Sequence, residues 1–308
     1  MSESLFSVAG LTHRFPGVIA LRGLDADVPR GRIGLVGANG AGKSTLIKVL
    51  LGLLHPAEGS VQLLGLDVRT GRREIRSRVG YMPEGACLPL DQSAADFVAY
   101  SAELAGLPTS AARRRSSEAL TLVGLAEERF RYLGDFSTGM FQRVKLAQAI
   151  VHDPEVVFLD EPASGLDPDG RQQMLDLINR LGDFGISVVF STHIIDDIEK
   201  TCEWVVMLDG GQLRRNGPLS RLGTHGVIRL EVIGDRAAVA AGLTEAGATV
   251  TAEPSHLVVR GGDDSYRLIR DVVASVGAGI RLMREAEVTL EEAFFIEPSP
   301  PPVPEGPS

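Results

Sequence analysis

The chain has 308 residues and a mass of 32.8 kDa, which is enough for about two domains. Hydrophobic residues make up 44% and charged residues 23% of it, which is ordinary globular usage and excludes disorder throughout. The net charge of −9 argues against a protein that coats nucleic acid, so no nucleic acid partner is expected. No apolar run reaches the roughly 20 residues of a membrane span, and the first residues do not resemble a secretion signal. These patterns predict a cytoplasmic protein.

The first two thirds of the chain alternate between strand-like and helical segments. A strand is predicted near Leu5 to Arg14, and a second one, Arg32 to Val36, ends in a glycine-rich loop that precedes a helix from Lys43 to Leu53. Helical stretches such as Gly170 to Leu181 separate further strand-like runs, at Ser60 to Leu64, Arg78 to Met82, Glu155 to Leu159, Ser187 to Ser191 and Trp204 to Leu208. This alternation predicts an α/β fold with a parallel sheet at its core.

A helical subdomain interrupts this pattern between about residues 85 and 150. From Ser93 to Val151 the β signal vanishes, and apolar residues recur at helical spacing, as in Phe97, Tyr100 and Leu104. We therefore expect helices to be inserted between two strands of the sheet.

The remaining residues predict a small separate domain. Strands and helices follow one another in the order β-α-β-β-α-β, which is the ferredoxin-like order. The predicted ranges are Val227 to Val232, Arg236 to Ala246, Ala248 to Ala252, His256 to Arg260, Ser265 to Val276 and Ile280 to Arg284. Thr289 opens a short final helix, and a proline-rich tail follows that cannot bury itself. The expected domains are thus residues 1–224, an α+β domain at 225–297 and a disordered tail at 298–308.

The glycine-rich loop carries the first chemistry. Residues 37–44 read GANGAGKS and fit the phosphate-binding pattern GxxxxGK[ST]. Glycines let backbone N–H groups curl around phosphate oxygens, and the N-terminus of the next helix adds a partial positive charge. The nucleotide-binding residues expected here are Gly37, Asn39, Gly40, Gly42, Lys43, Ser44 and Thr45. Lys43 would bridge the β- and γ-phosphates of ATP, and the Ser44 hydroxyl would bind Mg²⁺.

Two carboxylates follow the apolar strand that begins near Glu155. Asp160 and Glu161 emerge at the carboxyl edge of the sheet, where parallel sheets bind ligands. Adjacent residues on a strand point apart, so the two roles should differ. Asp160 is suited to the Mg²⁺ shell, and Glu161 to polarising the water that attacks the γ-phosphate.

These motifs, together with FSTGM at residues 136–140, resemble the ATP-binding cassette (ABC) family. FSTGM stands where that family has its LSGGQ signature, and the following sequence through LDEP stays close to the family. The resemblance implies an ATPase that uses ATP and Mg²⁺. It also implies site roles for residues outside the loop, namely Phe15 (stacking on adenine), Glu84 (Q-loop), Ser137 and Gly139 (signature), Asp167 (D-loop) and His193 (contact to the γ-phosphate).

The sequence departs from the family pattern at two places. Glu84 stands where most members have glutamine, and a glutamate there can still ligate Mg²⁺ or position water. Thr138 and Met140 replace a glycine and the glutamine of the signature, whereas Ser137 and Gly139 are retained. Both variants resemble bacterial exporters in which the ATPase and the membrane permease are separate chains.

The resemblance also implies partners. In the family, the signature of one subunit completes the ATP site of another, so we expect a homodimer or a heterodimer of ATPase subunits. An integral-membrane permease is expected to dock near Glu84 and residues 85–92. The protein would then be attached peripherally to the inner face of the cell membrane.

Two other functions compete with this interpretation. A soluble cassette ATPase could remodel ribosomes or DNA, although such proteins usually carry fused cassettes, long coiled-coil insertions or basic arms, none of which the sequence shows. A regulatory nucleotide-binding module with the last domain as its sensor is the third hypothesis. Co-purification with a polytopic membrane partner would favour transport over both.

Overall fold

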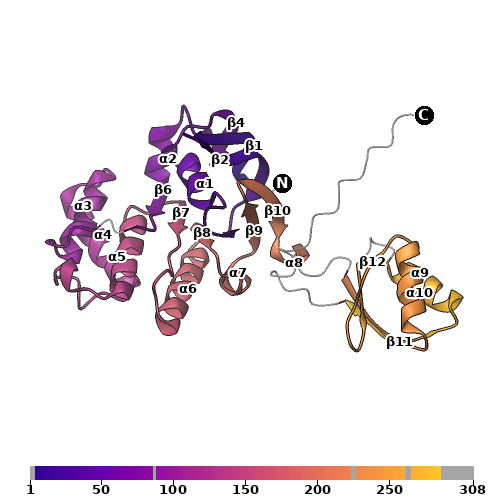
Figure 1. Ribbon diagram of the computed structural model, residues 1–308. Helices are drawn as coiled ribbons and strands as arrows, with labels where there is room; N and C mark the ends of the chain where they lie inside the picture. The colour runs from indigo at the N-terminus through magenta and orange to yellow at the C-terminus, as the bar shows by residue number, and fades with distance from the viewer. Residues whose placement is uncertain (1–3, 86–87, 223–226, 261–264, 286–308) are drawn as a thin grey trace. The chain divides into compact units, whose positions relative to one another are not determined.

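The structure, a computed structural model, describes residues 4–85, 88–222, 227–260 and 265–285 (Figure 1). The chain forms two compact units, Met1–Gly217 and Pro218–Ser308. Within the described residues, no helix combines the length and the apolar character that crossing a bilayer requires. The expected helix from Thr289 and the tail at 298–308 lie outside the described residues.

A six-stranded sheet in the order β10-β9-β3-β8-β7-β6 forms the centre of the first unit. Pairing is parallel from β9 through β3, β8 and β7 to β6, as the alternation of strands and helices predicts. β7 and β8 are buried along their whole length, because helices cover both faces of a parallel sheet. The strands are β3 (Arg32–Val36), β6 (Val79–Met82), β7 (Val156–Asp160), β8 (Ser187–Thr192), β9 (Trp204–Asp209) and β10 (Gln212–Pro218).

A second, antiparallel sheet contains one long strand that the sequence did not predict. Its order is β2-β1-β4-β5, from β1 (Ser4–Phe15), β2 (Val18–Pro29), β4 (Glu58–Leu63) and β5 (Leu66–Asp67). Several register shifts interrupt the β1–β2 pairing, and Gly23 has a φ of 59°. These irregularities break the two-residue alternation by which a half-buried strand is recognised, which is why β2 was missed.

Helix α1 (Lys43–Leu50) lies between the two sheets and contacts β2, β4 and β7. Its apolar residues Leu46, Ile47 and Leu50 join one buried cluster with side chains of both sheets. Figure 1 shows α6 (Pro168–Asp183) and α7 (Ile195–Thr201) on the other side of the parallel strands. α1 thus fixes the glycine-rich loop before it against the sheet edge where β3 ends. A further helix, α2 (Arg72–Arg78), precedes β6.

The inserted helical subdomain is present where the periodicity predicts it. It consists of α3 (Ala94–Leu104), α4 (Thr109–Leu122), a short 3-10 helix at Leu133–Asp135 and α5 (Thr138–Ile150). Ser93 caps α3 by accepting a hydrogen bond from the backbone N–H of Asp96 at 3.1 Å. α5 also packs on β6 and β7, so the subdomain is joined to the sheet through this helix.

The second unit has the ferredoxin-like strand order β12-β13-β11-β14 with antiparallel pairing. Helices α9 and α10 contribute Val239, Leu243, Ile269 and Val273 to its apolar core. Each observed end differs from the predicted one by a single residue at most. The unit begins with the short helix α8 (Leu219–Leu222), and its other elements are β11 (Val227–Ile233), α9 (Arg236–Glu245), β12 (Thr249–Ala252), β13 (Leu257–Arg260), α10 (Ser265–Ser275) and β14 (Gly279–Glu285).

Candidate active site

The glycine-rich loop between β3 and α1 is shaped by glycines that no other residue could replace without strain. A Cβ at Gly37 would lie 2.3 Å from the carbonyl oxygen of Leu208. Gly42, which caps α1, has a φ of 105°, and a Cβ there would lie 2.8 Å from the carbonyl oxygen of Ala20. Asn39 and Gly40 are exposed at the tip of the loop. The loop therefore offers its main chain to solvent beside the start of a helix.

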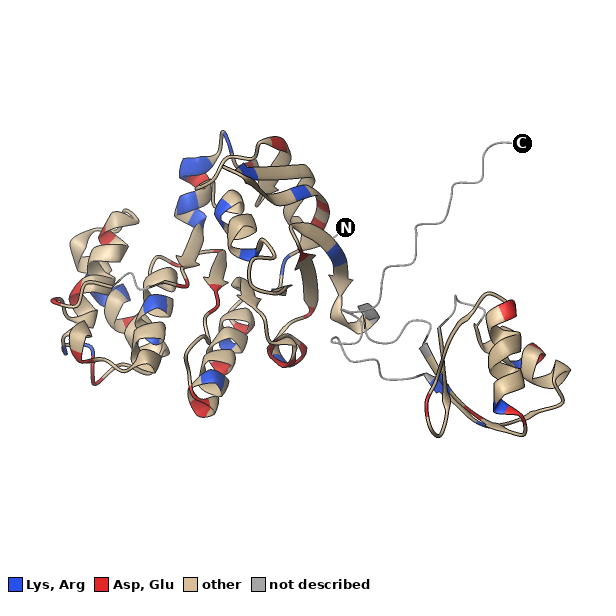
Figure 2. Cartoon of the chain, viewed as in Figure 1, with Lys and Arg blue, Asp and Glu red and all other residues tan. Residues whose placement is uncertain are grey.

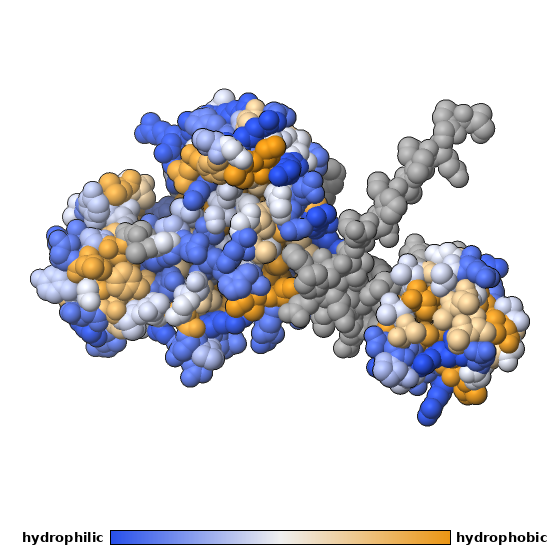
Figure 3. All heavy atoms as spheres, in the orientation of Figure 1, coloured by the Kyte–Doolittle hydropathy of each residue, from blue (hydrophilic) through white to orange (hydrophobic). Residues whose placement is uncertain are grey.

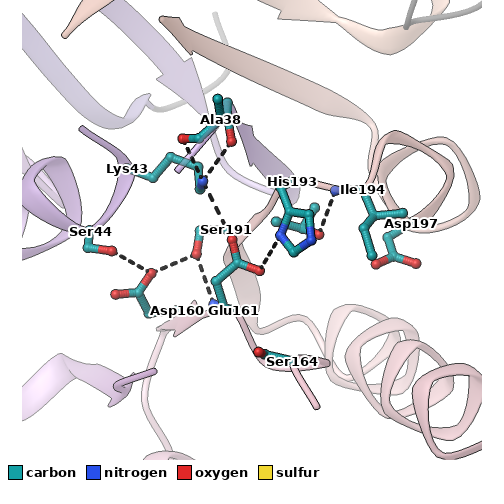
Figure 4. A network of polar contacts seen from close by, with 12 residues as sticks. Ala38, Lys43, Ser44, Asp160, Glu161, Ser164, Ser191, His193, Ile194 and Asp197 are labelled. Carbon is teal, nitrogen blue, oxygen red and sulfur yellow. Dashed lines mark hydrogen bonds and ion pairs between the residues drawn. The ribbon is translucent and has the colours of Figure 1, made fainter. Parts of the chain in front are cut away.

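Lys43 is buried, with 6% of its surface exposed, and its ammonium group stays close to the loop. The Nζ atom donates hydrogen bonds to the carbonyl oxygens of Gly37 at 2.7 Å and Ala38 at 3.3 Å (Figure 4). It also lies 3.5 Å from Oε1 of Glu161. The positive charge is thus held between the phosphate-binding loop and the carboxylate that ends β7.

Ser44 and Asp160 form a pair of oxygen donors suited to a hard cation. The Ser44 hydroxyl donates to Oδ1 of Asp160 at 3.0 Å, and Asp160 is only 2% exposed. Mg²⁺ in nucleotide sites takes one or two protein oxygens together with phosphate oxygens, so this pair fits it. Thr45 is half-buried beside Ser44 in the first turn of α1.

Glu161 combines a buried side chain with an uncommon backbone conformation. It is 8% exposed and has a φ of 49°, which is rare for a residue other than glycine. Its Oε2 atom accepts a hydrogen bond from Nδ1 of His193 at 3.1 Å, whereas Oε1 is buried without a hydrogen-bond partner. Backbone strain and a buried oxygen without a hydrogen bond are typical of functional sites. The carboxylate can accept a proton from a water molecule placed next to it.

Ser191 is a site residue that the sequence analysis missed. It is fully buried on β8, and its hydroxyl donates to Oδ1 of Asp160 at 2.7 Å. The same hydroxyl accepts a hydrogen bond from the backbone N–H of Glu161 at 2.9 Å. One side chain therefore holds the Asp160 carboxylate and the backbone of Glu161. The sequence signal that could have indicated it is its position two residues before His193. The structure shows that β8 pairs with β7 and puts Ser191 opposite Asp160.

The signature and D-loop residues come together in a different place. Ser137 caps α5, accepting a hydrogen bond from the backbone N–H of Met140 at 3.3 Å, and Asp167 caps α6 by accepting one from Gly170 at 2.9 Å. Ser137, Gly139 and Asp167 line an open hollow of about 470 Å³ that includes no residue of the phosphate-binding loop. The structure thus divides the predicted site into two groups.

Phe15 lies at the end of β1 and is 43% exposed. Its ring meets that of His13 edge to face, with 4.7 Å between the ring centroids. His13 is buried, and its Nδ1 donates to the carbonyl oxygen of His55 at 2.8 Å. The hairpin continues into β2, where Ala20 approaches Gly42. An accessible aromatic ring is therefore held on a fixed neighbour, on the strand pair that borders the loop.

Glu84 follows the end of β6, next to the end of β7. Its side chain is exposed, and its backbone carbonyl accepts a hydrogen bond from Lys145 at 3.0 Å. Among the described residues, no hydrogen bond joins the Glu84 carboxylate to Ser44 or Asp160. Its expected part in binding Mg²⁺ stays a prediction.

Comparison with known proteins identifies the family. Residues 21–164 match the sequence family described as ABC transporter. An uncharacterised ABC transporter ATP-binding protein of Nostoc sp. is 42% identical over 208 residues, which are 67% of this chain and 62% of that protein. The daunorubicin resistance ATP-binding protein DrrA3 of Streptomyces coeruleorubidus is 30% identical over 305 residues, 97% of this chain and 94% of that protein.

A solved structure agrees with these matches. The structure of cbiO1 from Clostridium perfringens, described as part of the ABC transporter complex cbiONQ, has a TM-score of 0.64 and 27% identity, covering 70% of this chain and 89% of that one. The chain spans less than two thirds of the length of several curated relatives, including the Nostoc protein at 62%. The fold, the phosphate-binding loop and the near full-length match with DrrA3 agree, and the chain belongs to the family of ABC transporter ATP-binding proteins.

Proposed function

We propose that this chain binds ATP with Mg²⁺ and hydrolyses the bond between its β- and γ-phosphates. The observation that carries the proposal is the buried carboxylate of Glu161, which lies between the Lys43 ammonium group and His193 and whose Oε1 atom has no hydrogen-bond partner. Lys43 and the loop N–H groups hold the phosphates, and Glu161 accepts the proton of the water that attacks the γ-phosphorus, so that ADP and phosphate are released. Mg²⁺, when bound, neutralises charge on the phosphate oxygens, and Ser44 and Asp160 would hold it.

The residues that line the separate hollow, Ser137, Gly139 and Asp167, support a two-subunit ATPase. Ser137 and Gly139 begin α5, and the N-terminus of a helix binds phosphate oxygens. They line a hollow apart from the loop that holds Lys43, so they serve a nucleotide bound by another subunit. Two chains clasped head to tail would give each nucleotide both groups. The partner is a second copy or a related ATPase.

The helical subdomain supports a membrane permease as a further partner. It exposes several large apolar side chains, whereas soluble proteins rarely expose large apolar patches. Figure 3 shows hydrophobic surface over this part of the molecule. These residues are Leu90, Tyr100, Leu104, Phe130 and Tyr132, each more than half exposed. Docking there, beside Glu84, would attach the protein to the inner face of the membrane. The near full-length match with a drug-resistance protein favours export as the direction of transport.

The soluble alternative has weaker support. A cassette ATPase that remodels ribosomes would use its exposed surface to bind RNA or ribosomal protein. The relatives named above carry descriptions as transporter or drug-resistance ATP-binding proteins, and cbiO1 is described as part of a transporter complex. We therefore retain transport. Ribosomal proteins in place of a polytopic partner after purification from detergent-solubilised membranes would reverse this choice.

The substitution Lys43→Ala tests nucleotide binding. It removes the charge that holds the phosphates, so we expect ATP affinity measured by calorimetry to fall by about tenfold or more. Lys200→Met is the control, because Lys200 is exposed and pairs only with Asp196 on its own helix among the described residues. Unchanged affinity in Lys43→Ala would contradict the assignment.

A further inference from the structure

Lys145 is a buried charge that the proposed chemistry does not use. It lies on α5, which begins at the signature, and only 3% of its surface is exposed. Removing an ammonium group from water is costly unless hydrogen bonds compensate it. The Nζ atom of Lys145 donates to the backbone carbonyl of Glu84 at 3.0 Å. The signature helix therefore reaches the Q-loop directly.

Other hydrogen bonds join the residues that follow Glu84 to the segment just before the signature. The backbone N–H of Leu133 donates to the carbonyl of Gln92 at 2.9 Å, and that of Gly134 donates to Leu90 at 3.0 Å. On the other side of Glu84, Met82 still belongs to β6 and pairs with Leu159 of β7. The main chain thus passes from the sheet to the helical subdomain within two residues.

We propose that Lys145 is a positioning residue that fixes the backbone of Glu84 to the signature helix, so that Glu84 keeps its place relative to Ser137 when the helix moves. This inference rests on the proposed function, because the positioning of Glu84 matters for turnover only if the chain hydrolyses ATP. When the signature engages the nucleotide of the other subunit, Lys145 carries Glu84 with it. Without Lys145, Glu84 would be held only through β6, and it would no longer move with Ser137 at the start of α5.

Lys145→Met separates positioning from a purely structural role. Methionine has a similar length and no charge, so the cost of burying the ammonium group is removed together with its hydrogen bond to Glu84. We therefore expect the thermal midpoint of Lys145→Met to equal or exceed that of the unaltered protein. Lys200→Met, at an exposed lysine, is the matched control.

Hydrogen exchange measured by mass spectrometry on the full chain without nucleotide is the direct test. In Lys145→Met, we expect the peptide that covers Val79 to Gly85 to exchange about tenfold faster, because a net hydrogen bond to a charged group is lost. The peptide that covers the phosphate-binding loop should not change. Equal exchange at 79–85 in a folded variant would overturn the proposal, and so would acceleration of both peptides together, which indicates a structural role.

A double-mutant cycle supplies the functional readout. In Lys145→Met, we expect the Mg²⁺ concentration for half-maximal hydrolysis to rise about fivefold or more, whereas Glu84→Ala should abolish any further effect of Lys145→Met. Additive effects would overturn the proposal. Failure of the proposed function would appear instead as unchanged nucleotide binding in Lys43→Ala, and the exchange experiment would still report on Lys145.

Discussion

The two ends of strand β7 carry a glutamate each, and their surroundings differ. Glu155, just before the strand, has a side chain that is 39% exposed and accepts hydrogen bonds from Arg78 at 2.6 Å and Arg30 at 3.2 Å. Glu161, just after it, has a side chain that is 10% exposed, a φ of 49° and one oxygen without a hydrogen-bond partner. Figure 2 marks the charged residues along the chain, including the acidic residues where β7 ends.

The difference between the two glutamates reflects a difference between the two edges of the sheet, one serving stability and the other the proposed chemistry. At the amino edge of the sheet the charges are paired and partly in water, and Arg32 likewise pairs with Glu203 at 2.5 Å. Such pairs contribute little to the free energy of unfolding and need no ligand. At the carboxyl edge, charges are buried, strained and incompletely paired, an arrangement that costs stability and persists where chemistry requires it. Substitutions at the two edges should therefore have opposite kinds of effect.

Glu161→Gln should have the largest effect on turnover. Glutamine keeps the size of the side chain but cannot accept the proton, so we expect kcat to fall by about 10²- to 10⁴-fold with ATP binding retained. Gel filtration with ATP should show a trapped dimer. Glu155→Gln, at the opposite end of the same strand, is the matched control, and its kcat should equal that of the unaltered protein. Near-normal hydrolysis by Glu161→Gln would show that Glu161 is not the base.

The sequence predicted the residues at the carboxyl edge of the sheet better than those at the amino edge, because phosphate-binding residues lie in short, recognisable sequence motifs. Lys43, Ser44, Asp160 and Glu161 were all predicted in this way, and the structure brings them into contact in pairs. At the amino edge, Arg78 pairs with Glu155, which is far away in the sequence. Such a pair depends on the order of strands in the sheet, which no local pattern specifies.

The same argument explains the two residues missed in the site and its surroundings. Ser191 acts on Asp160 only because β7 and β8 are neighbours in a particular register. Lys145 is a lysine on a helix, and helical spacing alone predicts an exposed side chain there. Its burial follows from the packing of α5 on β6.

Ser191→Ala should have an intermediate effect and extends the comparison to strand β8. The change removes a donor to Asp160 and leaves the backbone N–H of Glu161 without its partner, so we expect kcat to fall by about tenfold or more. Ser187→Ala is the control at the amino edge, where the buried hydroxyl accepts a hydrogen bond from the backbone N–H of Gly31 at 3.3 Å. Both variants should lose about 1 kcal/mol of unfolding free energy, and only Ser191→Ala should lose activity. Equal activity of the two would refute the special role of Ser191.

Glu155→Gln should have the smallest effect, on stability alone and only above acidic pH. The hydrogen bond from Arg78, followed by the charge of Arg78 and by the hydrogen bond and charge of Arg30, lowers the pKa of Glu155 below its usual value. The folded state therefore holds this carboxylate charged more readily than the unfolded chain, and the resulting stability is present above about pH 4.3 and is lost as the pH falls through the lowered pKa. Because the side chain is 39% exposed, the loss at pH 7 should be no more than about 1 kcal/mol. Urea denaturation of both proteins from pH 7 downward measures it. A difference that grows on acidification would mean that Glu155 is stabilised as the neutral acid, and the contrast between the two edges would fail.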